Sequence, residues 1–482
     1  MDTSILNQLF DIQDFKQKSK QLLKLISEHL EQTVTEPTKK TLSWNEPDDE
    51  LRFWKEFFKT GNIDDFFPEI LKRTTHTHNP KYVGHQVGVT APITLLTGML
   101  SNLLNNGMAV YEMGMSPNAI ERIVTEKLCK AIGYDSPSGG FLTSGGTLAN
   151  LTALLSARKA KVPHDVWNLG HAQPLGIMVC EEAHYCVDRA AKIMGLGKKG
   201  IIKVPANRNF AIDVEQLETY YQRSIAKGIQ IFAIVGSAPS TATGAYDDLE
   251  AIQQFAEKYN LWFHVDGAHG GAAIFSEKYT HLLKGAEKSD SMVIDGHKMM
   301  MMPTITTALL YRNKKHADHT FSINADYLLS ETEEDEWYNS GRRTFECTKT
   351  MMCLHWYVLL KVYGEKVFGT YVTRQYDLGK EFEKLLLKEP DFEIATSPMS
   401  NILCFRYTDS NLSQEDLNEI NTKVRQALLE DGEFYLVQTK LRGTLYLRTT
   451  LMNPFTTREH LESLLKKIRT RAKKLIPSRV RQ

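Results

Sequence analysis

Two short apolar runs in this chain each end in residues that could carry out chemistry. Residues 292–294 lead into Asp-Gly-His-Lys (295–298), and residues 261–265 lead into Asp-Gly-Ala-His (266–269). Each run predicts a buried strand, and the carboxyl-terminal edge of an open α/β sheet is where ligands bind. A lysine beside a buried carboxylate at that edge indicates a lysine that forms a Schiff base and an acid that protonates a pyridine nitrogen.

Lys298 could instead be a surface lysine at the end of a strand. The apolar residues 299–303 that follow it argue against that reading. Desolvation would lower the pKa of such a lysine and make its amine a better nucleophile. His297 beside it could hold a phosphate or relay a proton.

A metal site is the alternative for the upstream run. His264 and Asp266 lie two apart in the predicted strand, so they share a face, and His269 follows them. A further ligand is missing, and a lysine stands where an open coordination position is expected. We therefore predict no metal. A buried Asp266 still needs a cationic or donor partner, and a protonated pyridine nitrogen would serve.

A third segment could bind an anion. Ser-Gly-Gly-Thr (144–147) precedes a predicted helix over 148–161. Glycines let backbone N–H groups turn inward, hydroxyls donate, and the helix dipole favours negative charge, so this turn could hold a phosphate. An ordinary helix cap is the alternative.

The elements that must position these residues follow from the hydrophobic pattern. Over 76–365, strand-like runs alternate with helical stretches, which favours a mostly parallel sheet covered by helices. Residues 1–75 show a helical periodicity, and 366–482 predict a small α+β domain with strands near 401–407 and 444–450. We expect a helical N-terminal segment, a large domain and a small C-terminal domain with these boundaries.

Composition narrows the class of protein. A net charge of +0 over 482 residues gives no global field toward nucleic acid or an anionic membrane. The six cysteines contain no Cys-x-x-Cys pair, and no apolar run approaches the length of a bilayer span. We expect a cytoplasmic protein that binds neither nucleic acid nor membrane.

Taken together, the motifs resemble the group II pyridoxal-phosphate-dependent amino-acid decarboxylases, which include glutamate, aromatic-amino-acid and diaminobutyrate decarboxylases. The resemblance runs from about residue 78 to the C-terminal helix. The segments that carry it are His-Asn-Pro-Lys-Tyr (78–82), Met-Ser-Pro (115–117), Thr-Ser-Gly-Gly-Thr-Leu-Ala-Asn-Leu-Thr (143–152), Glu-Ala-His-Tyr (182–185), His-Val-Asp-Gly-Ala (264–268), Asp-Gly-His-Lys (295–298), Gly-Arg-Arg (341–343) and Leu-Arg (447–448) ahead of Asn-Pro (453–454).

The resemblance implies a fold-type I enzyme, a homodimer with a shared active site, and pyridoxal 5'-phosphate as cofactor. Lys298 would hold the cofactor as a Schiff base, and Asp266 would pair with its pyridine nitrogen. His184 would stack on one face of the ring and Ala268 would pack on the other. The remaining cofactor residues implied are Gly146, Thr147 and His297 at the phosphate, Ser144 close by, and Thr241 at the 3-hydroxyl.

The implied reaction converts an L-amino acid to its amine and CO2 through a quinonoid intermediate. Arg448 falls where glutamate decarboxylases hold the substrate α-carboxylate, and His85 and Gln86 fall where relatives read the side chain. A mobile loop at about 328–340 would supply the final proton, from Tyr338. Met299 and Pro239 depart from the usual family residues, and His85 and Gln86 match neither the glutamate nor the aromatic pattern closely, which leaves the substrate open. Carbon–carbon lyase chemistry, oxidative decarboxylation to an aldehyde and, least of all, a non-catalytic scaffold are the alternatives.

Overall fold

The computed structural model describes residues 4–321 and 336–476, and its chain divides into two compact units. The central unit comprises Gln86–Lys384 and Ile394–Cys404. The terminal unit comprises Met1–His85, Leu385–Glu393 and Phe405–Gln482. The division into three domains expected from the sequence stays a prediction.

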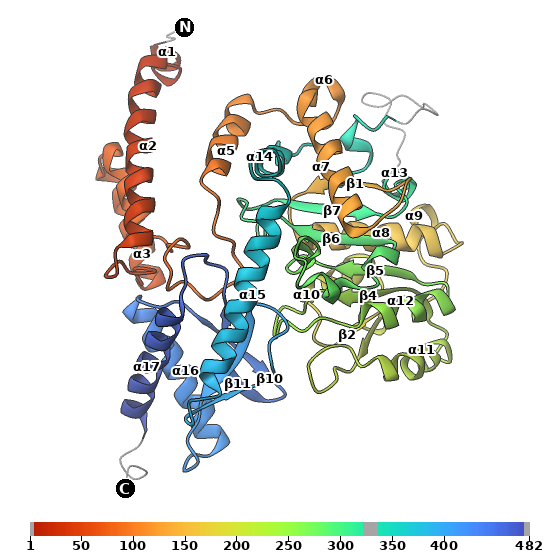
Figure 1. Cartoon of the computed structure of the whole chain (residues 1–482). Helices are drawn as coiled ribbons and strands as arrows, with labels where there is room; N and C mark the ends of the chain where they lie inside the picture. Colours follow the sequence, from red (N-terminus) through yellow and green to blue (C-terminus); the bar gives the residue numbers. More distant parts are fainter. Residues whose placement is uncertain (1–3, 322–335, 477–482) are drawn as a thin grey trace. The chain divides into compact units, whose positions relative to one another are not determined.

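The central unit is built on a seven-stranded sheet of order β1-β7-β6-β5-β4-β2-β3. The pairs from β3 through β6 are parallel, whereas β7 runs antiparallel to both β6 and β1, so the mostly parallel sheet is confirmed. Figure 1 shows these strands side by side. The strands are β1 (Gly139–Thr143), β2 (Leu175–Cys180), β3 (Ile201–Val204), β4 (Gln230–Ser237), β5 (Trp262–Asp266), β6 (Ser291–Asp295) and β7 (Thr307–Tyr311).

Helices cover both faces of this sheet. On one face α8 packs on β4 through β7, and on the other α12 packs on β4 and β5. Close packing there requires Gly236, where a Cβ would lie 2.7 Å from Leu249 of α12. The helices are α5 (Ile93–Leu104), α6 (Tyr111–Gly114), α7 (Ser116–Ile132), α8 (Gly146–Lys161), α9 (Val166–Leu169), α10 (Tyr185–Ile193), α11 (Leu217–Ile225), α12 (Leu249–Lys258), α13 (Lys315–Thr320), α14 (Cys353–Tyr363) and α15 (Lys366–Leu386).

The alternation of side chains along each strand decides which polar groups face α8. Trp262 of β5 and Val293 of β6 belong to one buried cluster with Ala149 and Ala153 of α8. Residues two apart in a strand point to the same face. Asp266 therefore shares the α8 face with Trp262, and Asp295 shares it with Val293, each at the carboxyl end of its strand.

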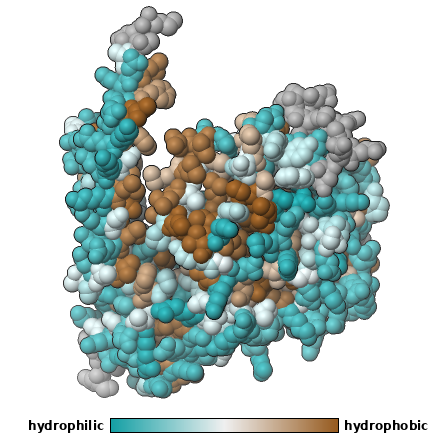
Figure 2. Space-filling model, turned by 45° about the horizontal axis from the view of Figure 1, so that its top comes forward, coloured by the Kyte–Doolittle hydropathy of each residue, from teal (hydrophilic) through white to brown (hydrophobic). Residues whose placement is uncertain are grey.

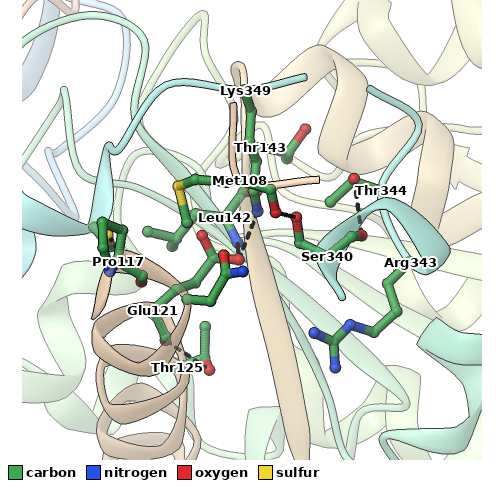
Figure 3. A network of polar contacts seen from close by, with 12 residues as sticks. Met108, Pro117, Glu121, Thr125, Leu142, Thr143, Ser340, Arg343, Thr344 and Lys349 are labelled. Carbon is green, nitrogen blue, oxygen red and sulfur yellow. Dashed lines mark hydrogen bonds and ion pairs between the residues drawn. The ribbon is translucent and has the colours of Figure 1, made fainter. Parts of the chain in front are cut away.

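A buried ion pair fixes β1 just before the Ser-Gly-Gly-Thr turn. Lys349 Nζ lies 2.6 Å from Glu121 Oε1 of α7 and donates to the Leu142 carbonyl oxygen at 2.8 Å. The Leu142 N–H donates to the same Glu121 oxygen at 3.2 Å. Figure 3 shows both side chains meeting at Leu142. The strand end is thus held by charge-assisted bonds on both of its peptide groups.

The terminal unit contains helices from both ends of the chain and a smaller sheet. Its sheet has the order β10-β11-β9-β8, and α16 packs on α17 and on β11. Among the described residues, no helix combines the length and apolar character needed to cross a membrane. The elements that lie wholly or partly in this unit are α1 (Ser4–Leu9), α2 (Ile12–Thr35), α3 (Pro47–Thr60), α4 (Phe66–Lys72), β8 (Phe392–Ile394), β9 (Ile402–Tyr407), α16 (Gln414–Asp431), β10 (Val437–Leu441), β11 (Thr444–Thr450) and α17 (Arg458–Leu475).

Candidate active site

A cavity of about 280 Å3 opens in the central unit where β5 and β6 end and α8 begins. All of the residues that the sequence assigned to the cofactor line this one cavity, although they come from separate parts of the chain. They are Ser144, Gly146, Thr147, His184, Thr241, Asp266, Ala268, His297 and Lys298.

Lys298 forms an ion pair inside the cavity. Its Nζ lies 3.0 Å from Asp295 Oδ2, and the Asp295 side chain is 2% exposed. Burial by itself lowers the pKa of Lys298, but the charges of Asp295 and Asp266 outweigh burial and raise it above the ordinary value. The lowered pKa expected from desolvation is therefore wrong for this chain, because strand geometry brings two carboxylates to the amine.

Asp266 stands at the end of β5. Its Oδ1 accepts the Ala268 N–H at 3.2 Å, and the Cys186 thiol lies 3.8 Å from its Oδ2. Burial, followed by the charge of Asp266, raises the pKa of Cys186. Cys186 is therefore a neutral thiol that donates weakly to a carboxylate.

His184 caps the start of α10. Its Nδ1 accepts the Cys186 N–H at 3.3 Å. Burial, with Lys298 adding to it, lowers the pKa of His184 despite the nearby carboxylates. The imidazole is accordingly neutral at neutral pH and presents an uncharged ring to the cavity.

His297 and Asp295, the two polar neighbours of Lys298, are held by residues at the start of β7, the strand beside β6. His297 Nδ1 lies 3.1 Å from the Thr306 carbonyl oxygen, and its Nε2 lies 3.5 Å from Asp295 Oδ2. Thr307 donates its hydroxyl to Asp295 Oδ1 at 2.6 Å, across the β6–β7 register. Asp295 is thus the common partner of Lys298, His297 and Thr307.

The turn into α8 has the geometry of an anion site. Gly145 has a φ of +100°, which an L side chain rarely adopts, and a Cβ on Gly146 would lie 3.1 Å from both carboxylate oxygens of Asp295. Glycine at these two positions lets backbone approach the cavity. Ser144 donates its N–H and hydroxyl to Glu346 Oε1 at 2.9 and 2.6 Å.

His264 does not reach the cavity. It is fully buried, with Nε2 2.7 Å from Asn150 Oδ1 and Nδ1 2.8 Å from Ser291 Oγ. Burial lowers the pKa of His264 to about 4. Both ring nitrogens are occupied by a polar network that joins α8, β5 and β6.

The other predicted site residues are not among the lining residues of this cavity. Tyr338 packs edge-on against Tyr111, and its loop lies partly outside the described residues. Gln86 belongs to the central unit, whereas His85 and Arg448 belong to the terminal unit. There the partial burial of His85, with the charges of Arg448 and Arg425, lowers the pKa of its imidazole.

Sequence reasoning gave no role to three residues that matter here. Asp295 could have been found, because it ends β6 on the same face as Val293. Cys186 could have been suspected from its place two residues after His184. Glu346 carries no local signal, because it lies 202 residues from Ser144.

A family model described as the pyridoxal-dependent decarboxylase conserved domain matches residues 61–408. The chain belongs to the pyridoxal-dependent decarboxylase family. It is a carboxy-lyase that uses pyridoxal 5'-phosphate to decarboxylate an amino acid, as the resemblance implied.

The relatives of this decarboxylase align over most of its length. An aromatic-L-amino-acid decarboxylase from Bacillus atrophaeus is 28% identical over 84% of each chain. A phenylacetaldehyde synthase from Arabidopsis thaliana is 24% identical over 86% of each. The structure of the glutamate decarboxylase domain of a Vibrio parahaemolyticus diaminobutyrate-pyruvate transaminase and L-2,4-diaminobutyrate decarboxylase has a TM-score of 0.80 at 26% identity, covering 94% of this chain and 96% of that one.

The cavity fits the cofactor chemically. Lys298 provides an amine for the aldehyde, and Asp266 provides an acceptor for a protonated pyridine nitrogen. The glycines at the start of α8 open backbone N–H groups toward a phosphate. These groups all line one cavity.

Proposed function

We propose that this decarboxylase attaches pyridoxal phosphate to Lys298 and acts on an L-amino acid at this cavity. The observation that carries the proposal is that Asp266 ends β5, Lys298 follows the end of the adjacent strand β6, and both line the cavity. When bound, the cofactor supplies an electron sink for the electrons of the bond to the carboxylate. Asp266 accepts the N–H of the pyridine nitrogen and stabilises its positive charge in a low-dielectric site.

The start of α8 holds the phosphate in this proposal. Gly146 and Thr147 offer N–H groups at the positive end of the helix dipole, and the Thr147 hydroxyl adds a donor. His297 lies beside this end of the cavity, tied to Thr306. His184, Ala268 and Thr241 line the same cavity, and in this proposal His184 would pack on one face of the ring, Ala268 on the other, and Thr241 would approach the 3-hydroxyl. A neutral His184 can stack without repelling a cationic ring.

Substrate recognition is assigned to Arg448, Gln86 and His85. Arg448 is 8% exposed on β11, and a guanidinium that is this far removed from water forms a strong charge-assisted contact with a carboxylate. The Gln86 side-chain nitrogen is buried and has no hydrogen-bond partner among the described residues. An unsatisfied buried donor is costly, so a polar substrate side chain is a natural partner for it.

Protonation after CO2 loss is assigned to Tyr338, in the loop at about 328–340. Its ring contacts Tyr111 and Trp337 at ring-centroid distances of 5.6 and 5.7 Å. The phenol hydroxyl is the only acid of this side chain, so Tyr338→Phe tests the assignment directly. A variant that still forms the amine, but more slowly because solvent must supply the proton, would support the assignment. Unchanged turnover would remove Tyr338 from the protonation step.

We further propose that the enzyme is a homodimer with a shared active site. The α5 face (Leu96, Met99, Leu100, Leu103 and Leu104) is exposed, with Leu103 exposed by 74%. Figure 2 shows apolar surface gathered in this region. An apolar face of this kind is a protein–protein interface more often than free surface. A second copy of the chain is the occupant that the proposal names.

We propose a cytoplasmic location because the cysteines are unpaired. All six are free thiols in the structure, and five are buried. Unpaired thiols are usual in a reducing compartment.

The experiment is a substrate screen of the pyridoxal-phosphate-loaded protein. The common amino acids, ornithine, diaminobutyrate, DOPA and cysteine sulfinate are tested while CO2, amine and peroxide are followed together. CO2 with the matching amine supports the proposal and names the substrate. CO2 with aldehyde and peroxide favours oxidative decarboxylation, which the similarity to the phenylacetaldehyde synthase keeps as the second candidate. No CO2 from any compound would favour a carbon–carbon lyase.

A further inference from the structure

The carboxylate of Glu346 accepts hydrogen bonds from groups just before α8, where the proposed function places the phosphate. One oxygen, Oε1, accepts the Thr143 hydroxyl at 2.8 Å, the Ser144 N–H at 2.9 Å and the Ser144 hydroxyl at 2.6 Å. Both donors of Ser144 are therefore engaged by an anion of the chain itself. The residue stands in a segment that the Lys349–Glu121 ion pair anchors at Leu142.

Glu346 is ionised in this position. Burial would raise the pKa of its carboxyl, but the hydrogen bonds from Ser144 and Thr143 lower it further than burial raises it. Its other oxygen, Oε2, is buried and has no hydrogen-bond partner among the described residues. A full negative charge is thus held close to the N-terminus of α8, where the helix dipole favours one anion.

A second carboxylate already flanks the same end of the cavity. Both oxygens of Asp295 would lie 3.1 Å from a Cβ on Gly146, and the nearest cation, Lys298, is paired with Asp295. No arginine is among the cavity-lining residues in the described part of the chain. A phosphate that binds here therefore meets neutral donors and the carboxylate of Asp295, without a guanidinium to offset the charge, while Glu346, which lines a neighbouring cavity, holds the donors of Ser144.

We propose that Glu346 sets how tightly the enzyme holds the phosphate of its cofactor, by competing with that phosphate for the Ser144 N–H and hydroxyl. The inference rests on the proposed placement of the phosphate at the start of α8. Two effects act in the same direction: the donors are occupied, and like charges repel at short range. Removing the charge while keeping an acceptor oxygen should therefore tighten phosphate binding.

The test compares the affinity of the cofactor-free protein for pyridoxal phosphate in the wild type, Glu346→Gln and Glu277→Gln. Glu277 is exposed and is not among the cavity-lining residues, so its variant matches the change in charge outside the cavity. We expect Glu346→Gln to lower Kd by about tenfold, the effect of roughly one pKa unit of interaction. Pyridoxal, which lacks the phosphate, should bind wild type and Glu346→Gln equally.

A double-mutant cycle identifies Ser144 as the contested donor. Ser144→Ala should change the phosphate-dependent affinity little in the wild type, because Glu346 holds the hydroxyl. The same change should weaken binding several-fold in the Glu346→Gln background, because a neutral amide oxygen holds the hydroxyl less strongly than a carboxylate and yields it to the phosphate. Equal effects in both backgrounds would overturn the competition between Glu346 and the phosphate.

Inorganic phosphate separates this inference from the function proposed for Lys298. Titration with inorganic phosphate alone, measured by calorimetry, gives the phosphate affinity at the start of α8 whether or not Lys298 attaches the cofactor. Tighter phosphate binding by Glu346→Gln supports the inference, even if the wild type failed to attach pyridoxal phosphate. Unchanged or weaker binding by a variant whose circular dichroism and melting match the wild type overturns it. Glu346→Asp, which keeps the charge, should not gain affinity.

Discussion

Asp295 Oδ2, at the end of β6, lies 3.0 Å from Lys298 Nζ, and the Asp295 side chain is only 2% exposed. The residue three positions before the lysine therefore decides the protonation of its amine. Burial lowers the pKa of Lys298, while Asp295 and Asp266 raise it to a value above the ordinary one. The cofactor-free enzyme thus holds a charged lysine at neutral pH.

Asp295→Asn is expected to shift the pH dependence of cofactor attachment. Only the neutral amine attacks an aldehyde, so attachment to the wild type should speed up as pH rises toward the raised pKa. Removing the Asp295 charge lowers that pKa, and each unit lost increases the neutral fraction at pH 7 about tenfold. Stopped-flow absorbance between pH 6 and about 9 measures the profile. A profile identical to that of the wild type would show that Asp295 does not control the amine.

Lys298→Ala is expected to abolish covalent attachment of the cofactor. The absorbance at about 400 nm and the mass added after borohydride reduction should both be lost. Lys298→Arg is the matched control, because it keeps a cation beside Asp295 and so preserves the charge balance of the cavity. A reducible band that persists in Lys298→Ala would assign the attachment to another lysine.

Arg448→Ala is expected to weaken substrate capture. Loss of a charge-assisted contact costs about 1.5–3 kcal/mol, which corresponds to roughly 10–100-fold in kcat/KM. Arg448→Lys keeps the charge but loses the bidentate geometry of the guanidinium. Its kcat/KM should therefore lie between those of the wild type and Arg448→Ala. Steady-state kinetics on the substrate found in the screen measure the effect, and unchanged kinetics would remove Arg448 from substrate binding.

Lys349→Met is expected to destabilise the central unit. The Lys349 and Glu121 side chains are 1% and 7% exposed, so the change leaves a buried carboxylate without its cation. The free energy of unfolding should fall by about 3–5 kcal/mol, measured by denaturant titration. Adding Glu121→Gln should restore part of it, because the amide leaves no uncompensated charge. A double variant no more stable than Lys349→Met would contradict this account.

Leu103→Lys is expected to convert the proposed dimer to a monomer. A charge on the exposed α5 face would be desolvated in an interface but tolerated in water. Ile193→Lys, at a side chain that is 65% exposed on α10, is the control for a new surface lysine. Light scattering coupled to gel filtration distinguishes the two states. A dimer that persists at low micromolar concentration would place the interface elsewhere.

Local pattern determined the parts of the site that lie at strand ends. The apolar runs before Asp266 and Lys298 predicted two strands, and the alternation of side chains placed Asp266 with its neighbours on one face. The turn before α8 was recognisable as a possible anion site, but the same residues are ordinary helix caps, so only the resemblance to the family assigned it to a phosphate. Sequence alone thus determined the family, the cofactor and the lining of one cavity.

Tertiary structure decided the partners of those residues. Glu346 reaches Ser144 across 202 residues, and Lys349 reaches Glu121 across 228. The raised pKa of Lys298 likewise depends on two carboxylates converging from β5 and β6. Hydrophobic periodicity predicts which face of its helix or strand a side chain occupies. It does not state which distant element covers that face, because the path of the chain and the packing of the core settle that choice.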